Sequence, residues 1–177
     1  MNDVYPPAED SYFLSSILER EIPKQLKKNK EIKVIEIGSG SGIQLETVNK
    51  LGIKKENIFS VDINKKAVEH CKKLGFQCIQ SNLFSKIKGK FDLIIFNPPY
   101  LPQDKRDRKK DTTGGKRGDE TIKRFLTQAK KHLNSNGKIL LLISSLTPTI
   151  NFKNYKARIL EEKPIFFEKL YVREIRL

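Results

Sequence analysis

The fold is indicated by Ile32-Lys33-Val34-Ile35-Glu36-Ile37-Gly38-Ser39-Gly40-Ser41-Gly42, where a short apolar run leads directly into three alternating glycines. The apolar run predicts a buried strand. The glycines permit a tight turn and let the backbone approach a ligand closely, and the helix expected after them presents free backbone N–H groups at that turn. The stretch therefore predicts a strand, a glycine-rich turn and a helix with a ligand beside the turn.

The spacing of these glycines restricts the kind of ligand. A dinucleotide-binding turn has the pattern G-x-G-x-x-G, and Ile43 stands where its third glycine would be. A ligand without a pyrophosphate requires only that the loop approach an amino-acid portion and a ribose. Taken alone, however, a glycine-rich turn has about an even chance of being only a structural turn with no ligand beside it.

Polar residues also stand at the ends of the next two apolar runs. Asp62 closes the run at residues 57–63, where a carboxylate can accept hydrogen bonds from both hydroxyls of a ribose, as in other doubly wound sheets. Asn82 and Leu83 follow the run at residues 76–80 and are placed to flank an adenine. Asp62 by itself would instead be interpreted as a helix cap or a solvated carboxylate.

The most informative motif is Asn97-Pro98-Pro99-Tyr100, which follows the apolar run at residues 91–96. Two prolines after a strand end its pairing and hold a rigid, extended turn. This turn presents the Asn97 side-chain oxygen and the Pro98 carbonyl in fixed directions. Two converging acceptors hold both hydrogens of a planar NH₂ group and turn its lone pair toward an electrophile, while Tyr100 packs on the flat face. The arrangement suits methyl transfer to an amide, adenine, cytosine or guanine nitrogen.

The segments between these motifs predict an α/β fold. Helical spacing predicts helices at about residues 9–21, with Asp10 or Ser11 as the cap, between Asn64 and Gly75, and at about residues 119–133, and residues 23–33 are interpreted as a basic connector. Strands are predicted at residues 138–144, after a turn at Asn136-Gly137, and as a pair between about residues 157 and 177 broken near Pro164. The repeated β-α units predict a single domain, residues 1–177, with a mostly parallel sheet and an antiparallel C-terminal edge.

Composition leaves the partner open. The 177 residues carry a formal net charge of +14, which suggests an anionic partner such as RNA, DNA, the ribosome or an acidic protein. Lysine is spread through the whole chain, however, and genome composition or life at high temperature produces the same pattern. No apolar run is long enough to span a membrane, and the first residues lack a signal segment, so a cytoplasmic protein is expected. Cys71 and Cys78 fit no metal spacing, and His70 and His132 lie in lysine-rich contexts, so no metal site is predicted.

Residues 103–118 interrupt the regular pattern. They are polar, strongly basic and rich in glycine, ending in Gly114-Gly115-Lys116-Arg117-Gly118. Loops of this length are usually functional or disordered. Because the segment follows the proposed catalytic turn, we interpret it as a substrate-side loop, and a plain solvated loop is the alternative.

With these motifs in place, the chain resembles a known family. Val4-Tyr5-Pro6-Pro7-Ala8-Glu9-Asp10-Ser11 resembles the V-Y-x-P-A-E-D-T/S segment of the archaeal and eukaryotic HemK-like methyltransferases, which are similar to bacterial PrmC enzymes but lack their N-terminal helical domain. The G-x-G-x-G turn resembles the first motif of class I S-adenosylmethionine (SAM) methyltransferases. The resemblance continues through Asp62-Ile63-Asn64, residues 96–100 and residues 114–118. It implies a Rossmann-like fold with a seven-stranded, mostly parallel sheet.

The resemblance also implies a function. This family methylates the side-chain amide nitrogen (N5) of the glutamine in the Gly-Gly-Gln motif of class I translation termination factors, with SAM as donor and S-adenosyl-L-homocysteine as product. The implied cofactor contacts are Ser11, Glu36, Gly38, Gly40, Gly42, Asp62, Ile63, Asn82 and Leu83. The implied catalytic and substrate-binding residues are Asn97, Pro98, Pro99 and Tyr100, and residues 1–30 are expected to cover the cofactor. Members of this branch often work with a small zinc-binding subunit of the Trm112 type, which pairs along a sheet edge.

One departure and several alternatives accompany this interpretation. The segment between Ser144 and Ala157 is short and contains Pro148, so the helix that usually precedes the last two strands is expected to be reduced. The same Asn-Pro-Pro-Tyr turn would serve an RNA or DNA base amino-methyltransferase acting on adenine N6 or guanine N2. A protein-lysine methyltransferase and a non-catalytic SAM-binding module are the remaining alternatives.

Overall fold

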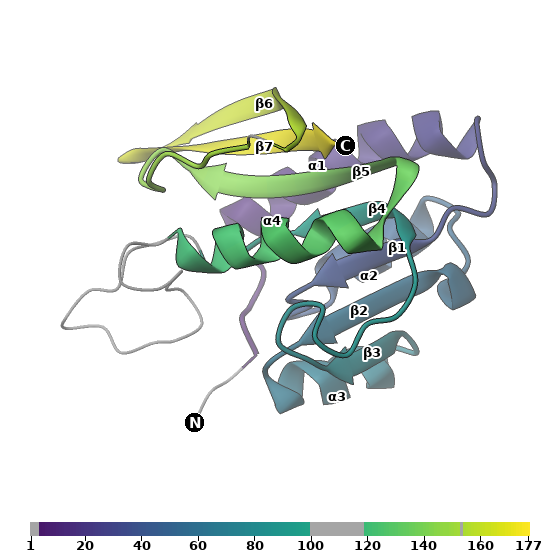
Figure 1. Cartoon of the computed structure of the whole chain (residues 1–177). Coiled ribbons are helices and arrows are strands. Elements are labelled where there is room, and N and C mark those ends of the chain that lie inside the picture. The colour runs from purple at the N-terminus through teal and green to yellow at the C-terminus, as the bar shows by residue number, and fades with distance from the viewer. Residues whose placement is uncertain (1–3, 100–118, 153) are drawn as a thin grey trace.

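The computed structural model describes residues 4–99, 119–152 and 154–177, and the strands in these segments form a seven-stranded sheet (Figure 1). In spatial order the strands are β3 (Gln77–Gln80), β2 (Ile58–Asp62), β1 (Val34–Ile37), β4 (Phe91–Phe96), β5 (Leu133–Ser144), β7 (Glu168–Arg176) and β6 (Lys156–Ile165). Strands β1 to β5 pair in parallel, whereas β7 is antiparallel to both β5 and β6. The predicted mostly parallel sheet with an antiparallel C-terminal edge is confirmed.

Helices cover both faces of this sheet, so its central strands are buried on both sides. Figure 1 shows α4 (Glu120–His132) in front of the sheet, with α1 (Glu9–Leu26) and α2 (Ile43–Lys50) behind it. Helix α3 (Lys65–Lys73) packs beside β3, and a short 3₁₀ helix, η1 (Lys55–Asn57), precedes β2. Alternate residues of β1 belong to opposite cores: Val34 faces the core of α1 and α2, and Ile35 the core of α4. This two-sided burial explains the continuous apolar runs of the sequence.

Helix α1 begins at Glu9, as predicted, but is longer than predicted. It continues through Pro23 to Leu26, where a connector was expected, because Ile22 is fully buried and Leu26 packs against the same core. Packing of these two side chains outweighs the backbone hydrogen bond that proline cannot donate. The N-cap is Ala8, so the prediction that Asp10 or Ser11 caps the helix is wrong: both lie inside the first turn.

The last three strands also differ in their limits from the prediction. Strand β5 begins at Leu133, directly after α4, and a register shift against β4 takes up Asn136-Gly137, which does not form a separate turn. Strand β6 runs through Pro164 to Ile165, because on an edge strand proline need not donate a ladder hydrogen bond. The chain reverses at residues 166–167 instead. No helix occupies the described residues between β5 and β6, as expected from the short connection.

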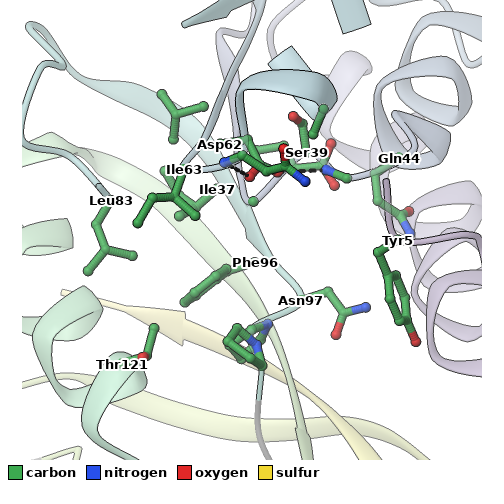
Figure 2. Close-up of a pocket in the computed structure, with 18 of the residues that line it drawn as sticks. Tyr5, Ile37, Ser39, Gln44, Asp62, Ile63, Leu83, Phe96, Asn97 and Thr121 are labelled. Atoms are coloured by element: carbon green, nitrogen blue, oxygen red, sulfur yellow. Dashed lines mark hydrogen bonds between the residues drawn. The ribbon is translucent and has the colours of Figure 1, made fainter. Parts of the chain in front are cut away.

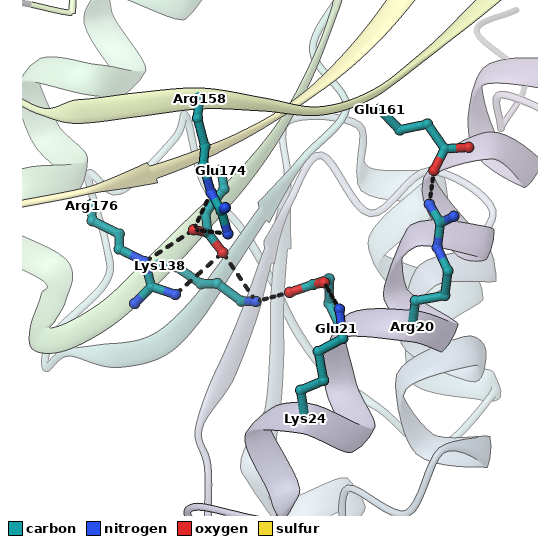
Figure 3. A network of polar contacts seen from close by, with 8 residues as sticks. All are labelled: Arg20, Glu21, Lys24, Lys138, Arg158, Glu161, Glu174 and Arg176. Carbon is teal, nitrogen blue, oxygen red and sulfur yellow. Dashed lines mark hydrogen bonds and ion pairs between the residues drawn. The ribbon is translucent and has the colours of Figure 1, made fainter.

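A buried charge network fixes α1 against the C-terminal half of the sheet (Figure 3). Lys138 on β5 is only 3% exposed, and its Nζ lies 2.5 Å from Glu21 of α1 and 3.4 Å from Glu174 of β7. Arg158 and Arg176 also contact Glu174. Burial opposes ionisation of Glu174, but hydrogen bonding from Arg176 and the charges of the three cations lower its pKa to about 2. The network thus holds the helix whose first turn reaches the site described next.

Candidate active site

A pocket of about 350 Å³ opens at the carboxyl ends of β1, β2 and β4 (Figure 2). In doubly wound sheets this edge is the usual ligand site. The structure brings the following sequence-predicted residues into its lining: Ser11, Glu36, Gly38, Gly40, Asp62, Ile63, Asn82, Leu83, Asn97, Pro98 and Pro99. Tyr100 and the loop at residues 103–118 lie outside the described residues.

The glycine-rich turn adopts backbone conformations that favour glycine. Gly38, Gly40 and Gly42 have φ values of 73°, 46° and 79°, in the region where a side chain is strained. The N–H groups of Gly38 and Ser39 donate to the Val61 carbonyl, which ties the turn to β2. Gly42 does not line the pocket. A Cβ there would lie 3.1 Å from the Leu74 side chain, so this glycine permits close packing of α2 against the end of α3.

Two carboxylates lie at the ends of β1 and β2, in different environments. Both oxygens of Asp62 accept backbone hydrogen bonds, from Gly40 N at 2.9 Å and from Asn64 N at 2.8 Å. Glu36 is 3% exposed, and its Oε2 has no hydrogen-bond partner among the residues that the structure describes. Burial, together with the nearby charges of Asp62 and Cys78, raises the pKa of Glu36 well above its usual range. An unsatisfied buried acceptor of this kind suits a ligand that donates a hydrogen bond.

Apolar and strained residues form the side of the pocket next to β2 and β3. The Leu83 backbone has φ 52°, an uncommon conformation for leucine. Leu83 and Ile63 both line the pocket and offer apolar surface to a flat ring. Asn82 accepts a hydrogen bond from Arg124 of α4 at 2.9 Å. Sequence reasoning missed Arg124 and its neighbour Thr121, because only the fold shows that the start of α4 reaches this pocket.

Asn97 occupies the end of the pocket that follows β4, and Figure 2 shows its side chain near Tyr5. Its Nδ2 donates to Asp10 Oδ2 at 2.8 Å. Its Oδ1 is buried and has no partner within the described segments. The Asn97 side chain therefore presents an oxygen acceptor without a partner in the described residues, while Asp10 holds the NH₂ group at the other end of the amide.

The N-terminal segment contributes two more lining residues that sequence reasoning did not place in the site, Tyr5 and Asp10. Three causes together raise the pKa of Tyr5 to about 12: burial, the charge of Asp10 and a hydrogen bond between Tyr5 and Asp10. Gln44, also missed, donates to the Ser11 carbonyl at 2.9 Å and accepts from Ser15 at 3.0 Å, which joins α1 to α2 behind the glycine turn. The only sequence signal for Tyr5 and Asp10 is that they lie in the family-like segment at residues 4–11.

No helix in the described residues combines the length and apolar character needed to cross a membrane. No group of three or more His, Cys, Asp or Glu side chains there is arranged to hold a metal ion.

Comparison with known proteins identifies the family. The methyltransferase small domain family matches residues 15–158. MJ0928 of Methanocaldococcus jannaschii, named as a candidate protein N5-glutamine methyltransferase, is 37% identical over 96% of this chain and 90% of its own length. The release factor glutamine methyltransferase of Borreliella burgdorferi is 36% identical over 73% of this chain and 50% of its own length.

Among solved structures, a SAM-dependent methyltransferase from Bacteroides fragilis in complex with S-adenosyl-L-homocysteine shares the fold. Its TM-score is 0.55 at 19% identity, over 90% of this chain and 77% of the other. This likeness agrees with the strand order of the sheet. The chain belongs to the methyltransferase small domain family and, within it, to the HemK/PrmC-like class of SAM-dependent methyltransferases.

Proposed function

We propose that this methyltransferase transfers a methyl group to the glutamine side-chain amide (N5) of the Gly-Gly-Gln motif in a class I translation termination factor. The observation that carries the proposal is the Asn97 side chain, whose buried Oδ1 is unpaired among the described residues while its Nδ2 is held by Asp10. A primary amide supplies the donor that this oxygen lacks. The names of the two relatives, an N5-glutamine and a release factor glutamine methyltransferase, support the choice of acceptor.

The lining of the pocket fits SAM. The unpaired Glu36 oxygen offers an acceptor to a cationic or hydroxyl donor, and Asp62 stands at the strand end where a carboxylate accepts ribose hydroxyls. Ile63, Asn82 and Leu83 would flank the adenine, with Ser11 and the glycine turn around the rest. When bound, SAM would supply an electrophilic methyl group attached to its sulfonium sulfur. Loss of that methyl group converts SAM into S-adenosyl-L-homocysteine.

The chain's own residues then act mainly by positioning. Asn97 Oδ1 and the Pro98 carbonyl accept the two hydrogens of the substrate NH₂ and fix the direction of its lone pair. The same two acceptors favour a nitrogen that begins to pyramidalise, which weakens amide resonance and stabilises developing positive charge. Pro98 and Pro99 keep the turn rigid. No strong base is required, because the methylated nitrogen is acidic and loses its proton to water.

The remaining roles are assigned on the same basis. Residues 1–30 would cover the cofactor as part of a single domain, a role supported by the positions of Tyr5, Asp10 and Ser11 in the lining. A Trm112-type zinc-binding subunit would pair along a sheet edge; β3 is one such edge, with Ile79 41% exposed. The loop at residues 103–118 would face the substrate. Because translation terminates in the cytoplasm, we place the reaction there.

The alternative is methylation of a nucleic-acid base. The net charge of +14 favours it, and the same acceptors would hold the exocyclic amine of adenine or guanine. A base must leave its stack to reach such a pocket, and a separate recognition region usually assists. Nucleic-acid binding would fall steeply with salt, which distinguishes this activity from methylation of a protein.

The direct test is methyl transfer from labelled SAM. The protein is incubated with a class I release factor from the same cell, with and without the zinc-binding subunit, and a parallel reaction contains total RNA. Label on the Gly-Gly-Gln glutamine, absent from a factor with that glutamine changed to alanine, would establish the acceptor. Dependence on the added subunit would establish the complex, and label on RNA alone would overturn the proposal.

A further inference from the structure

The first turn of α1 contacts the acceptor end of the pocket. Asp10 is buried, and its Oδ2 accepts a hydrogen bond from Asn97 Nδ2 at 2.8 Å, although 87 residues separate the two in sequence. Its other oxygen, Oδ1, accepts from the Ser11 backbone N–H at 2.7 Å and lies 3.3 Å from the Ser11 hydroxyl. The carboxylate is thus held at one oxygen by its own helix and pairs with Asn97 through the other, and Tyr5 forms a further hydrogen bond with it.

The chemistry of this pair fixes the orientation of the Asn97 amide. An ionised carboxylate only accepts hydrogen bonds, so it can pair with the NH₂ end of an asparagine but not with its oxygen. The two ends of an amide have nearly the same shape, and rotation by 180° would turn the NH₂ toward the substrate. Donors would then face the two hydrogens of the substrate nitrogen, and Asn97 would lose its function.

We propose that Asp10 is a positioning residue that keeps Asn97 Oδ1 directed at the acceptor nitrogen. The inference deepens the proposed function and rests on it for its catalytic consequence. The geometric part, an Asn97 amide held in one orientation by Asp10, applies to any NH₂ acceptor.

The fold provides Asp10 with a rigid support. Gln44 of α2 donates to the Ser11 carbonyl, one residue beyond Asp10, at 2.9 Å. At the other end of α1, Glu21 pairs with the buried Lys138. Asp10 also lies in the first turn, where the helix dipole favours a negative charge. A carboxylate on so constrained a helix can direct Asn97 more strictly than a side chain on a free N-terminal segment.

An exchange of the two residues tests the proposal. Asp10→Asn allows either amide orientation, and Asn97→Asp places two carboxylates against each other, so at pH 8.5 each single change is expected to lower kcat roughly 10- to 100-fold. In the double variant, Asn at position 10 donates to Asp at position 97, whose second oxygen again faces the substrate. We expect its kcat to recover to within about tenfold of the wild type. A residue that only stabilises the fold would give no such recovery.

Cofactor binding and a matched variant serve as controls. SAM affinity, measured by calorimetry, is expected to change less than about threefold in Asp10→Asn. The hydrogen bonds described above for Asp10 involve Tyr5, Ser11 and Asn97 rather than the glycine turn or Asp62. Glu9→Gln removes the neighbouring, exposed carboxylate of the same helical turn and should leave kcat unchanged. An equal loss in Glu9→Gln, or a double variant no better than the single ones, would overturn the proposal.

A second readout needs no methyl acceptor. In ¹⁵N-labelled protein, the Asn97 side-chain NH₂ signals are assigned by their loss in Asn97→Asp. One of the two protons should be shifted downfield and slow to exchange in the wild type, and Asp10→Ala should abolish both features. Unchanged signals would refute the positioning role. If the wild type methylates no release factor, the proposed function fails, whereas this measurement still decides the role of Asp10.

Discussion

Glu36→Gln should make the protein without cofactor more stable and its cofactor binding weaker. Glu36 is buried, and its Oε2 has no partner in the described parts of the chain. Such an unpaired buried acceptor costs about 1–3 kcal/mol. The amide has nearly the same shape but no charge, so at a pH at which Glu36 is ionised we expect the free energy of unfolding of the apoprotein to rise by about 1 kcal/mol, because loss of the buried charge outweighs burial of the new NH₂.

The same change should weaken SAM binding. At a pH at which Glu36 is ionised, a hydrogen bond from SAM to this charged acceptor would contribute roughly 1.5–3 kcal/mol, so the Kd for SAM should rise about 10- to 100-fold in the variant. Urea unfolding of the apoprotein gives the first quantity and calorimetric titration with SAM gives the second. Glu19→Gln, an exposed carboxylate on α1, is the matched control and should change neither.

The pH dependence of stability gives the prediction a sign. The pKa of Glu36 is raised by burial and by the charges of Asp62 and Cys78, whereas an unfolded glutamate titrates near about 4.3. Between these two values the native state holds a proton that the unfolded state has lost, so this carboxyl makes stability fall as pH rises. Glu36→Gln should remove that part of the fall. A variant that is less stable than the wild type yet binds SAM equally well would refute the reasoning.

Three other substitutions, together with Arg20→Ala as a control, separate substrate, cofactor and scaffold roles. Asn97→Ala should lower kcat at least about 100-fold while the SAM Kd changes little, because the acceptor for the substrate is lost; equal loss of both in kinetics and calorimetry would contradict this role. Asp62→Ala should weaken SAM binding first, since the carboxylate also holds the Gly40 N–H; an unchanged Kd would exclude it from the cofactor site. Lys138→Met leaves Glu174 and Glu21 without their shared buried cation and should cost roughly 3–5 kcal/mol in urea unfolding. Arg20→Ala, which breaks the exposed pair with Glu161, should cost at most about 1 kcal/mol, and similar costs for the two variants would show that the network is not special.

The sequence predicted the order of elements well because the signals are local. Continuous apolar runs identify strands buried on both faces, and glycine is needed where φ is positive, as at Gly38 and Gly40. Parallel strands bring their carboxyl ends to one edge, so motifs far apart in sequence were expected in one pocket. Gly42 was assigned to the cofactor by the same motif, but a Cβ on this residue would point at Leu74. No local sequence pattern reveals this contact.

Boundaries and long-range partners were not predictable in this way. Helix α1 passes Pro23 because of packing by Ile22 and Leu26, a tertiary effect that outweighs local preference. Asp10 was interpreted as a helix cap, the usual role of such a residue at that place. Its partner Asn97 follows strand β4 and lies 87 residues further along the chain, and only the packing of α1 brings the two side chains together.

Glu36 Oε2 and Asn97 Oδ1 are buried oxygens without partners in the described residues, and they belong to neighbouring strand ends. Glu36 pairs in register with Ile95 of β4, and Asn97 follows that strand one residue after Phe96, the partner of Ile37. Strands β1 and β4 are where the strand order reverses direction, with β2 and β3 on one side and β5 on the other. Connections leave this point in opposite directions, which opens a crevice between them. Each unpaired acceptor is unfavourable in the protein alone, so a donor from the cofactor at Glu36 and a donor from the substrate at Asn97 would both be stabilised there, side by side at the reversal point.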